Sequence, residues 1–191
     1  MVFLSVQGAE QNPLIPHHAV ERQLQAGPPG WTLLRPGFFA QNLGDAYRRD
    51  ITRDGRIYVP AGSGRVAFID ARDIAEVAAM ALLEPAAHAG RAYTLTGPAA
   101  ISLDEAARLL SQRLGRPIRY QPASVLGYVR HLLRQGAPLG QAAVLTILHL
   151  GLRLGQAASI DPTLAQLLGR PGRALAEYIA DHADLFTAER P

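Results

Sequence analysis

The sequence predicts an α/β fold built on a parallel sheet, and two observations support that fold class. Short β-prone runs alternate with helical runs along the first two thirds of the chain, the pattern of parallel strands joined by helices. The first run, MVFLSV, is apolar at nearly every position, as expected for a strand buried on both faces. The 191 residues are enough for one domain with a substantial core.

Turn and capping residues bound the expected elements. Pro36 and Gly37 end one strand, Asp70 can cap the helix that it begins, and Ser102 with Glu105 forms an S-x-x-E capping box at the start of another helix. The expected strands cover residues 1–6, 31–35, 57–59, 66–69, 91–96 and 118–120. The expected helices cover residues 17–25, 38–47, 70–84, 102–114, 125–134, 139–153, 162–168 and 175–186. The chain therefore ends in a helical region, which we expect to cap the carboxyl edge of the sheet.

Composition excludes several kinds of chemistry. All 19 basic residues are arginine, so a Schiff-base lysine, a P-loop lysine and a Y-x-x-x-K dehydrogenase pair are excluded. Cysteine is absent and no G-x-S-x-G elbow occurs, which excludes a thiol nucleophile and leaves hydrolase chemistry without support. A metal site is not expected, because His17, His18 and Glu21 lack a further evident ligand.

The charge and hydropathy patterns bear on partners and location. The net charge is +3 with scattered arginines, so we expect no nucleic-acid partner. The longest apolar stretch, residues 137–155, is interrupted by polar residues, so we expect no membrane partner. The chain start lacks a signal-peptide pattern, and together with the absence of cysteine this favours a cytoplasmic location.

The most informative stretch is WTLLRPGFFAQN, residues 31–42. Its strand ends at the turn formed by Pro36 and Gly37, and three further side chains follow above that end: Phe38, Phe39 and Asn42. Ligands of open parallel sheets bind outside the carboxyl ends of the strands. Two aromatic rings and an amide there predict a pocket wall, although ordinary core positions for both phenylalanines fit the residue types equally well.

A family resemblance rests on three segments in a fixed order: HHAVERQL at residues 17–24, LLRPGFFAQN at 33–42 and FIDARDIAEVAAMAL at 68–82. Together they resemble the NmrA-like family of atypical short-chain dehydrogenases/reductases. That family consists of NAD(P)-binding Rossmann proteins and includes redox-sensing regulators and reductases of quinones, azo dyes and triphenylmethane dyes. The resemblance covers residues 2–120 and implies the C-terminal part of a Rossmann-type parallel sheet with a helical substrate cap.

The dinucleotide loop of that family has no counterpart in the sequence. No G-x-G-x-x-G occurs, and the family carries this motif on its first strand. A βαβ unit takes about 30 residues, so the chain is expected to match from the fourth strand onward. We therefore expect a single incomplete domain over residues 1–191, with a Rossmann remnant at 1–120 and a cap at 121–191. Binding of NAD or NADP is expected to be weak or absent, and the sequence does not discriminate between the two.

The resemblance also implies site residues. His17 falls where many members have a lysine that contacts the ribose or substrate, so it is the candidate catalytic group, with a surface pair to Glu21 as the alternative. Four residues are candidates for cofactor binding: Ser5, Arg35, Pro36 and Phe38. Phe39 and Asn42 are candidates for substrate binding.

Three functions fit the resemblance. The first is NAD(P)H-dependent reduction of a small quinone-like or other electron-poor aromatic substrate. The second is a non-catalytic redox-sensing regulator, and the third is a truncated fragment without independent activity. Without a neighbour, the strand at residues 2–6 would form an unguarded edge. We therefore expect edge-to-edge homodimers, aggregation, or a need for the complementary half in trans.

Overall fold

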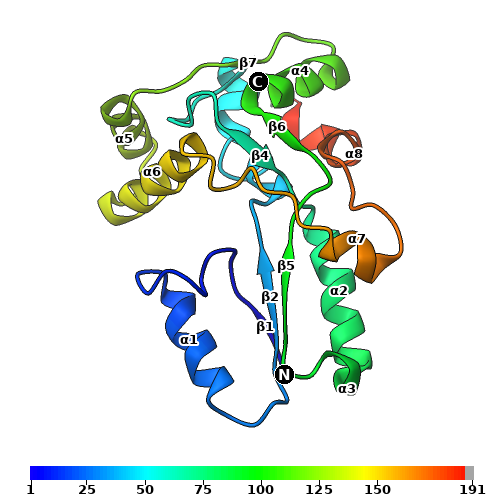
Figure 1. Cartoon of the computed structure of the whole chain (residues 1–191). Helices are drawn as coiled ribbons and strands as arrows, with labels where there is room; N and C mark the ends of the chain where they lie inside the picture. The colour runs from blue at the N-terminus through cyan, green and yellow to red at the C-terminus, as the bar shows by residue number, and fades with distance from the viewer. Residues whose placement is uncertain (188–191) are drawn as a thin grey trace. The chain divides into compact units, whose positions relative to one another are not determined.

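A computed structural model describes residues 1–187, which form two compact units. The first unit comprises residues 1–40, 68–99 and 160–174. The second unit comprises residues 41–67, 100–159 and the described residues from 175 onward. Figure 1 labels their helices and strands. No helix within residues 1–187 has the length and apolar character that crossing a membrane requires.

The first unit is built on a three-stranded parallel sheet. Its strands are β1 (Val2–Leu4), β2 (Thr32–Pro36) and β5 (Arg91–Leu95), in the order β1-β2-β5. Leu4 pairs with Leu34, and Leu34 pairs with Tyr93. The expected parallel α/β fold is therefore confirmed, and β1 lies at one edge of this sheet within the described part of the chain.

Helices α1 (Pro16–Gln25) and α2 (Ala71–Leu83) cover opposite faces of this sheet (Figure 1). Successive side chains of a strand point to opposite faces. Phe3 accordingly meets His17 of α1, with 6.1 Å between the ring centroids, whereas its neighbours Val2 and Leu4 face α2. The alternation along β1 thus separates a face that contacts α1 from an apolar face that contacts α2.

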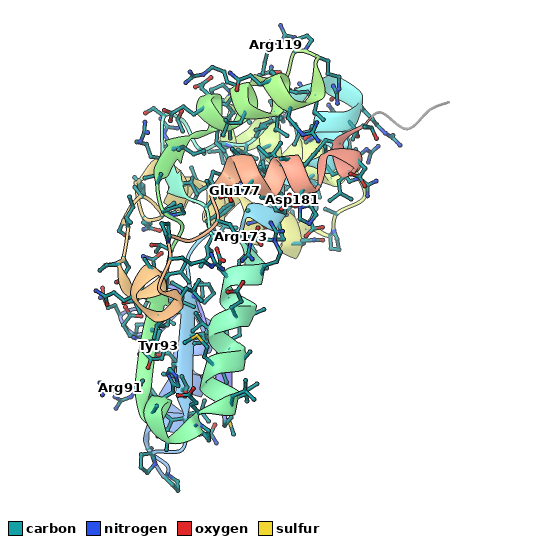
Figure 2. The ribbon with its side chains drawn as sticks, turned by 90° about the vertical axis from the view of Figure 1, so that its right-hand side faces the viewer. Arg91, Tyr93, Arg119, Arg173, Glu177 and Asp181 are labelled. Carbon is teal, nitrogen blue, oxygen red and sulfur yellow. The ribbon has the colours of Figure 1, made fainter. Side chains whose placement is uncertain are left out.

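Two shorter helices complete the first unit, α3 (Pro85–His88) and α7 (Thr163–Leu168). Its core is an apolar cluster between the sheet, α2 and α7, made by Leu34, Ile69, Ile74, Val77, Leu95 and Leu164. Asp70 caps α2 by accepting a 2.9 Å hydrogen bond from the backbone N–H of Arg72, as the sequence predicts. Asp73 is fully buried and instead binds Arg170 and Arg173; Figure 2 labels Arg173 near the start of α2.

The second unit contains two small ladders and most of the helices. β3 (Arg56–Ile57) pairs in parallel with β7 (Arg119–Tyr120), and β4 (Arg65–Ala67) pairs antiparallel with β6 (Ala100–Ser102). Its α-helices are α4 (Leu103–Leu114), α5 (Val125–Arg134), α6 (Leu139–Arg153) and α8 (Leu175–Asp181). A 3₁₀ helix follows at Ala183–Phe186. The predicted capping box of Ser102 and Glu105 is present at the start of α4.

The expected helix at residues 38–47 is wrong. The chain there forms a 3₁₀ helix, Ala40–Leu43, and a π-helix follows at Asp50–Asp54. Phe39 forms a parallel bridge with Ile69: the Ile69 N–H donates to the Phe38 carbonyl at 2.9 Å, and the Ala40 N–H donates to the Ile69 carbonyl at 2.8 Å. An α-helix starting at Phe38 would need the Phe38 carbonyl for its own first hydrogen bond, so tertiary pairing overrides the local helical pattern.

Candidate functional site

The carboxyl ends of the three parallel strands lie at one edge of the sheet in the first unit. Backbone hydrogen bonds continue the pairing past the strand ends, from Ser5 N to Leu34 O at 2.7 Å and from Gly37 N to Leu95 O at 2.8 Å. Another joins Gln7 N to Pro36 O at 2.9 Å. The edge thus brings together Ser5, Arg35 and Pro36, three of the four residues expected to bind a cofactor.

Glu21 of α1 binds two of these residues. The Ser5 hydroxyl donates to Glu21 Oε1, and Arg35 donates from Nε to Oε1 at 3.0 Å and from Nη2 to Oε2 at 2.6 Å. Glu21 is only 2% exposed. Burial alone would raise the pKa of Glu21, but the hydrogen bonds from Arg35 and Ser5 outweigh it and hold the pKa below its usual range. The carboxylate therefore stays ionised and holds α1 against the ends of two strands.

Glu21 does not form the surface pair with His17 that is the alternative to a cofactor or substrate contact for that histidine. Glu21 is the one buried side chain of α1 and binds Ser5 and Arg35. The H-x-x-x-E spacing identifies the carboxylate on the helix, but its partners depend on the pairing of β1 with β2. That pairing carries no local sequence signal.

His17 is half-buried, and its ring contacts Phe3 of β1. Its Nδ1 is a buried nitrogen without a hydrogen-bond partner among the described residues. The adjacent His18 differs, since its Nδ1 lies 2.7 Å from the Ala9 carbonyl oxygen. Buried polar atoms are nearly always hydrogen-bonded in folded proteins. His17 Nδ1 therefore offers a hydrogen-bonding position to a ligand at the α1 face of the sheet.

Phe38 and Phe39 have different surroundings. Phe38 is 7% exposed and packs edge-on against Phe68, with 5.7 Å between the ring centroids. Phe39 instead lines an apolar groove of about 360 Å³ on the α2 face of the sheet. The remaining lining residues are Val2, Leu4, Leu34, Ala71, Ile74, Ala75, Ala78 and Leu82. Of the two aromatic rings, Phe39 is thus the one placed to contact an apolar ligand in this groove.

Asn42 belongs to the second unit, where it lies in the 3₁₀ helix. The backbone carbonyl oxygen of Asn42 accepts a 3.1 Å hydrogen bond from the backbone N–H of Tyr47. A common pocket formed by Asn42 and the two phenylalanines stays a prediction.

A buried network in the second unit has no counterpart among the sequence-based expectations. The Tyr47 Oη lies 2.6 Å from His149 Nε2, and His149 Nδ1 lies 2.6 Å from the Leu145 carbonyl oxygen. The carbonyl requires a proton on Nδ1, so neutral His149 accepts from the Tyr47 hydroxyl at Nε2. Burial lowers the pKa of His149 to about 4 and raises that of Tyr47 well above its usual value. Both groups are uncharged at neutral pH.

A signal for this network is visible in the sequence. His149 interrupts the apolar run at residues 137–155, which argues against a membrane span. A histidine within an otherwise apolar helix also indicates a buried, hydrogen-bonded imidazole. Within residues 1–187, no group of three or more His, Asp or Glu side chains is arranged to hold a metal ion.

No family model matches the chain, but individual proteins do. The NAD(P)H azoreductase of Xenophilus azovorans is 38% identical over 168 residues, covering 88% of this chain and 58% of the azoreductase. The Escherichia coli NADPH-dependent quinone oxidoreductase QOR2 in complex with NADPH superposes with a TM-score of 0.82 at 29% identity. That match covers 94% of this chain and 64% of QOR2.

Two further solved structures resemble the chain. The Citrobacter sp. triphenylmethane reductase complexed with NADP(H) superposes with a TM-score of 0.83 at 26% identity, covering 94% of this chain and 64% of the reductase. The transcriptional regulator NmrA in complex with NAD shares the fold, at 14% identity and a TM-score of 0.65, covering 95% of this chain and 63% of NmrA. The chain spans little more than half the length of the curated relatives it matches. It belongs to the NmrA-like family of atypical short-chain dehydrogenases/reductases, Rossmann-type NAD(P)-binding proteins.

Proposed function

We propose that the chain forms the substrate-side part of an NAD(P)H-dependent reductase of quinone-like or other electron-poor aromatic compounds. The observation that carries the proposal is the meeting of Ser5, Arg35 and Pro36 at the carboxyl ends of adjacent parallel strands, where such sheets bind their ligands. The relatives named for azo, quinone and triphenylmethane reduction support the substrate class. The cofactor would be NAD or NADP.

In such a reaction the cofactor supplies the hydride, and the protein supplies orientation and exclusion of water. The Glu21–Arg35 pair would hold the strand ends rigid beside the nicotinamide. His17 Nδ1 would provide one hydrogen bond, or a weak acid, to the cofactor or the substrate. Phe39 would face the aromatic substrate, with Phe38 supporting the turn and Asn42 contributing an amide.

The cofactor requirement can be tested on the 191-residue chain. A glycine loop followed by a helix N-terminus normally holds the pyrophosphate, and the sequence contains no such motif. Calorimetry should therefore show no binding of NADPH or NADH with a micromolar dissociation constant. Such a constant would correspond to a binding free energy of about 8 kcal/mol. Micromolar binding by this chain would contradict the expected position of the dinucleotide.

The catalytic assignment requires a protein that also contains a glycine loop. The chain can be fused to the part of QOR2 that it does not match, and NADPH oxidation can be followed with panels of quinones and azo dyes. Phe39→Ala or Asn42→Ala should lower turnover and leave the NADPH dissociation constant nearly unchanged. Leu83→Ala, at an exposed position of α2, is the matched control. A weaker NADPH affinity with unaltered turnover would contradict the substrate assignment.

A non-catalytic regulator is the second candidate, favoured by the Glu21 network. Ser5 and Arg35 both donate to Glu21, which leaves His17 as the one candidate acid among the predicted site residues. The fold likeness to NmrA is consistent with this role. A fused protein that binds NADPH but oxidises none across the substrate panels would favour the regulator and reject the reductase.

We also propose that two copies of the chain pair through β1, which is an edge strand with its side chain Leu4 51% exposed. Light scattering should then detect dimers or larger species, and Phe3→Lys should reduce them. A monodisperse wild-type monomer with a cooperative melt would contradict this pairing. The cytoplasmic location and the division into a remnant at 1–120 and a cap at 121–191 also stay predictions.

A further inference from the structure

The helices α5 and α6 form a hairpin within the second unit (Figure 1). Both helices expose apolar side chains. In α6 the exposed stripe repeats every three or four residues and contains Ala143, Val144, Ile147 and Leu148. Ile147 is 70% exposed and Val144 is 66% exposed. Leu126 and Leu133 add to the apolar surface from α5. Exposed apolar side chains that gather on one part of a surface are typical of interaction sites.

The part of the sequence that contains the hairpin has basic residues but no acidic ones. Residues 106–159 contain no Asp or Glu and seven of the 19 arginines: Arg108, Arg113, Arg116, Arg119, Arg130, Arg134 and Arg153. The rest of the chain holds the other 12 arginines and all 16 acidic residues. Arg130 and Arg134 are exposed beside Leu126 and Leu133 on α5. Three of the seven, Arg130, Arg134 and Arg153, lie on the hairpin itself, which therefore carries positive charge without any acidic residue, although the chain as a whole carries only +3.

A pocket of about 290 Å³ at the end of α5 adds further basic groups. Arg49, Arg53 and Arg134 line it, together with Asp50, Asp54, His131 and Gln135. Asp50 is bound by His131 at 2.8 Å and by Gln135 at 3.2 Å, and Asp54 by Arg56 at 3.0 Å. Within the described residues neither Arg49 nor Arg134 forms an ion pair. The pocket can therefore accept an anionic group.

We propose that the α5–α6 hairpin and this pocket dock the chain onto an anionic phospholipid surface. The leucine, isoleucine and valine side chains would enter the interface between headgroups and acyl chains, while the arginines contact lipid phosphates. The sequence-based expectation of no membrane partner depends on the lack of a spanning segment, which a surface-bound helix does not need. The proposal is independent of the reductase activity.

Two other occupants fit the surface less well. A second copy docked through the same surface would bring like charges together, because a twofold interface places the same residues on both sides. Nucleic acid would match the charge, but single-strand binders stack bases on aromatic side chains, and the large apolar side chains exposed on α6 are all aliphatic. An anionic lipid surface satisfies both the charge and the aliphatic character.

Vesicle flotation tests the proposal, because bound protein rises with the vesicles and aggregated protein sinks. The 191-residue chain should float with vesicles of about one part phosphatidylglycerol to three parts phosphatidylcholine and not with phosphatidylcholine alone. Flotation should decrease as salt is raised. Equal flotation with both vesicle types, or none with either, would overturn the proposal.

Matched variants separate the apolar and the charged contributions. Ile147→Asp should weaken binding at least about tenfold, whereas Leu83→Asp, an equally exposed apolar position on α2, should not. The pair Arg130→Gln with Arg134→Gln should weaken it about 30-fold, at about 1 kcal/mol per arginine near the surface. The control pair is Arg22→Gln with Arg91→Gln.

Unchanged flotation of the hairpin variants would reject the assigned surface. Circular dichroism and a thermal melt show that each variant is folded, as expected for exposed positions. Self-association that Ile147→Asp abolishes, without any vesicle binding, would assign the surface to a second copy. Retention of the chain on double-stranded DNA without flotation would assign it to nucleic acid; either result overturns the proposal.

Discussion

The two units differ in their most deeply buried titratable groups. In the first unit these groups include two carboxylates paired with arginines: Glu21 with Arg35, and Asp73 with Arg170 and Arg173. In the second unit they include Tyr47 and His149, which form a neutral hydrogen bond. Removing one partner of a buried ion pair leaves an uncompensated charge, whereas a buried neutral imidazole is sensitive mainly to pH. The ends of the parallel strands should therefore be insensitive to pH near neutrality, and the helical unit should lose stability on mild acidification.

The largest expected effect comes from breaking the ion pair at the strand ends. Arg35→Met leaves the carboxylate of Glu21 buried and without its guanidinium partner. We expect a loss of about 3–5 kcal/mol in the free energy of unfolding, a large share of the roughly 5–15 kcal/mol of a typical domain. Urea denaturation of wild-type and variant chains measures it.

Two controls make this result specific. Arg22→Met changes an exposed arginine of α1, the helix that carries Glu21, and should cost far less. Adding Glu21→Gln to Arg35→Met should recover much of the loss, because it removes the unpaired charge. Equal stability of Arg35→Met and the wild type would show that Glu21 does not depend on the pair.

The second prediction concerns acidification of the helical unit. The pKa of His149 is lowered to about 4 from its ordinary value of 6.5, so the unfolded chain takes up a proton that the folded chain does not. The free energy of unfolding should therefore fall as the pH decreases from 6.5 to 4, by about 3 kcal/mol in all. Glu21 also loses its contribution to stability on acidification, but in a lower pH window. Its lowered pKa contributes stability that is complete above about 4.5 and is lost only at lower pH.

Denaturation at a series of pH values between 4.5 and 7.5 checks this difference. His149→Phe keeps an aromatic ring in the same place and should abolish the slope in this window. The Phe variant is less stable at neutral pH, because the Tyr47 hydroxyl loses its acceptor. The slope is the diagnostic quantity, and an unchanged slope in His149→Phe would assign it to another group.

The same comparison shows what the sequence could predict. Elements with strong local signals agree closely, such as α6, whose predicted and observed bounds are both residues 139–153. The α4 capping box and the Asp70 cap are also local signals, and both are confirmed. The predicted helix after Gly37 does not form, because the backbone hydrogen bonds of this segment go to Ile69, some 30 residues away in the chain. No local pattern encodes such a bond.

The candidate site also contains some features that the sequence predicts and others that it does not. Placing Ser5, Arg35 and Pro36 together required only the fold class, because parallel strands end at one edge. The position of Glu21 between these residues depends on the register of β1 and β2. The Tyr47–His149 contact joins residues that are 102 positions apart in the chain. Both networks arise from tertiary packing, which composition and periodicity do not specify.

The smallest expected effect tests whether burial or ion pairing makes the stability of the first unit sensitive to the loss of a carboxylate. Glu76 binds the same arginines as Asp73, through Arg170 at 2.8 Å and Arg173 at 2.9 Å, but its side chain is 43% exposed. Hydrogen bonds from these arginines lower its pKa, yet water already solvates much of its charge. Glu76→Gln should therefore change the free energy of unfolding by no more than about 1 kcal/mol. Asp73→Asn, at a fully buried position with the same arginine partners, should cost several times more in the same urea titration. Equal losses in the two variants would mean that the number of ion pairs, and not their burial, determines the stability of the first unit.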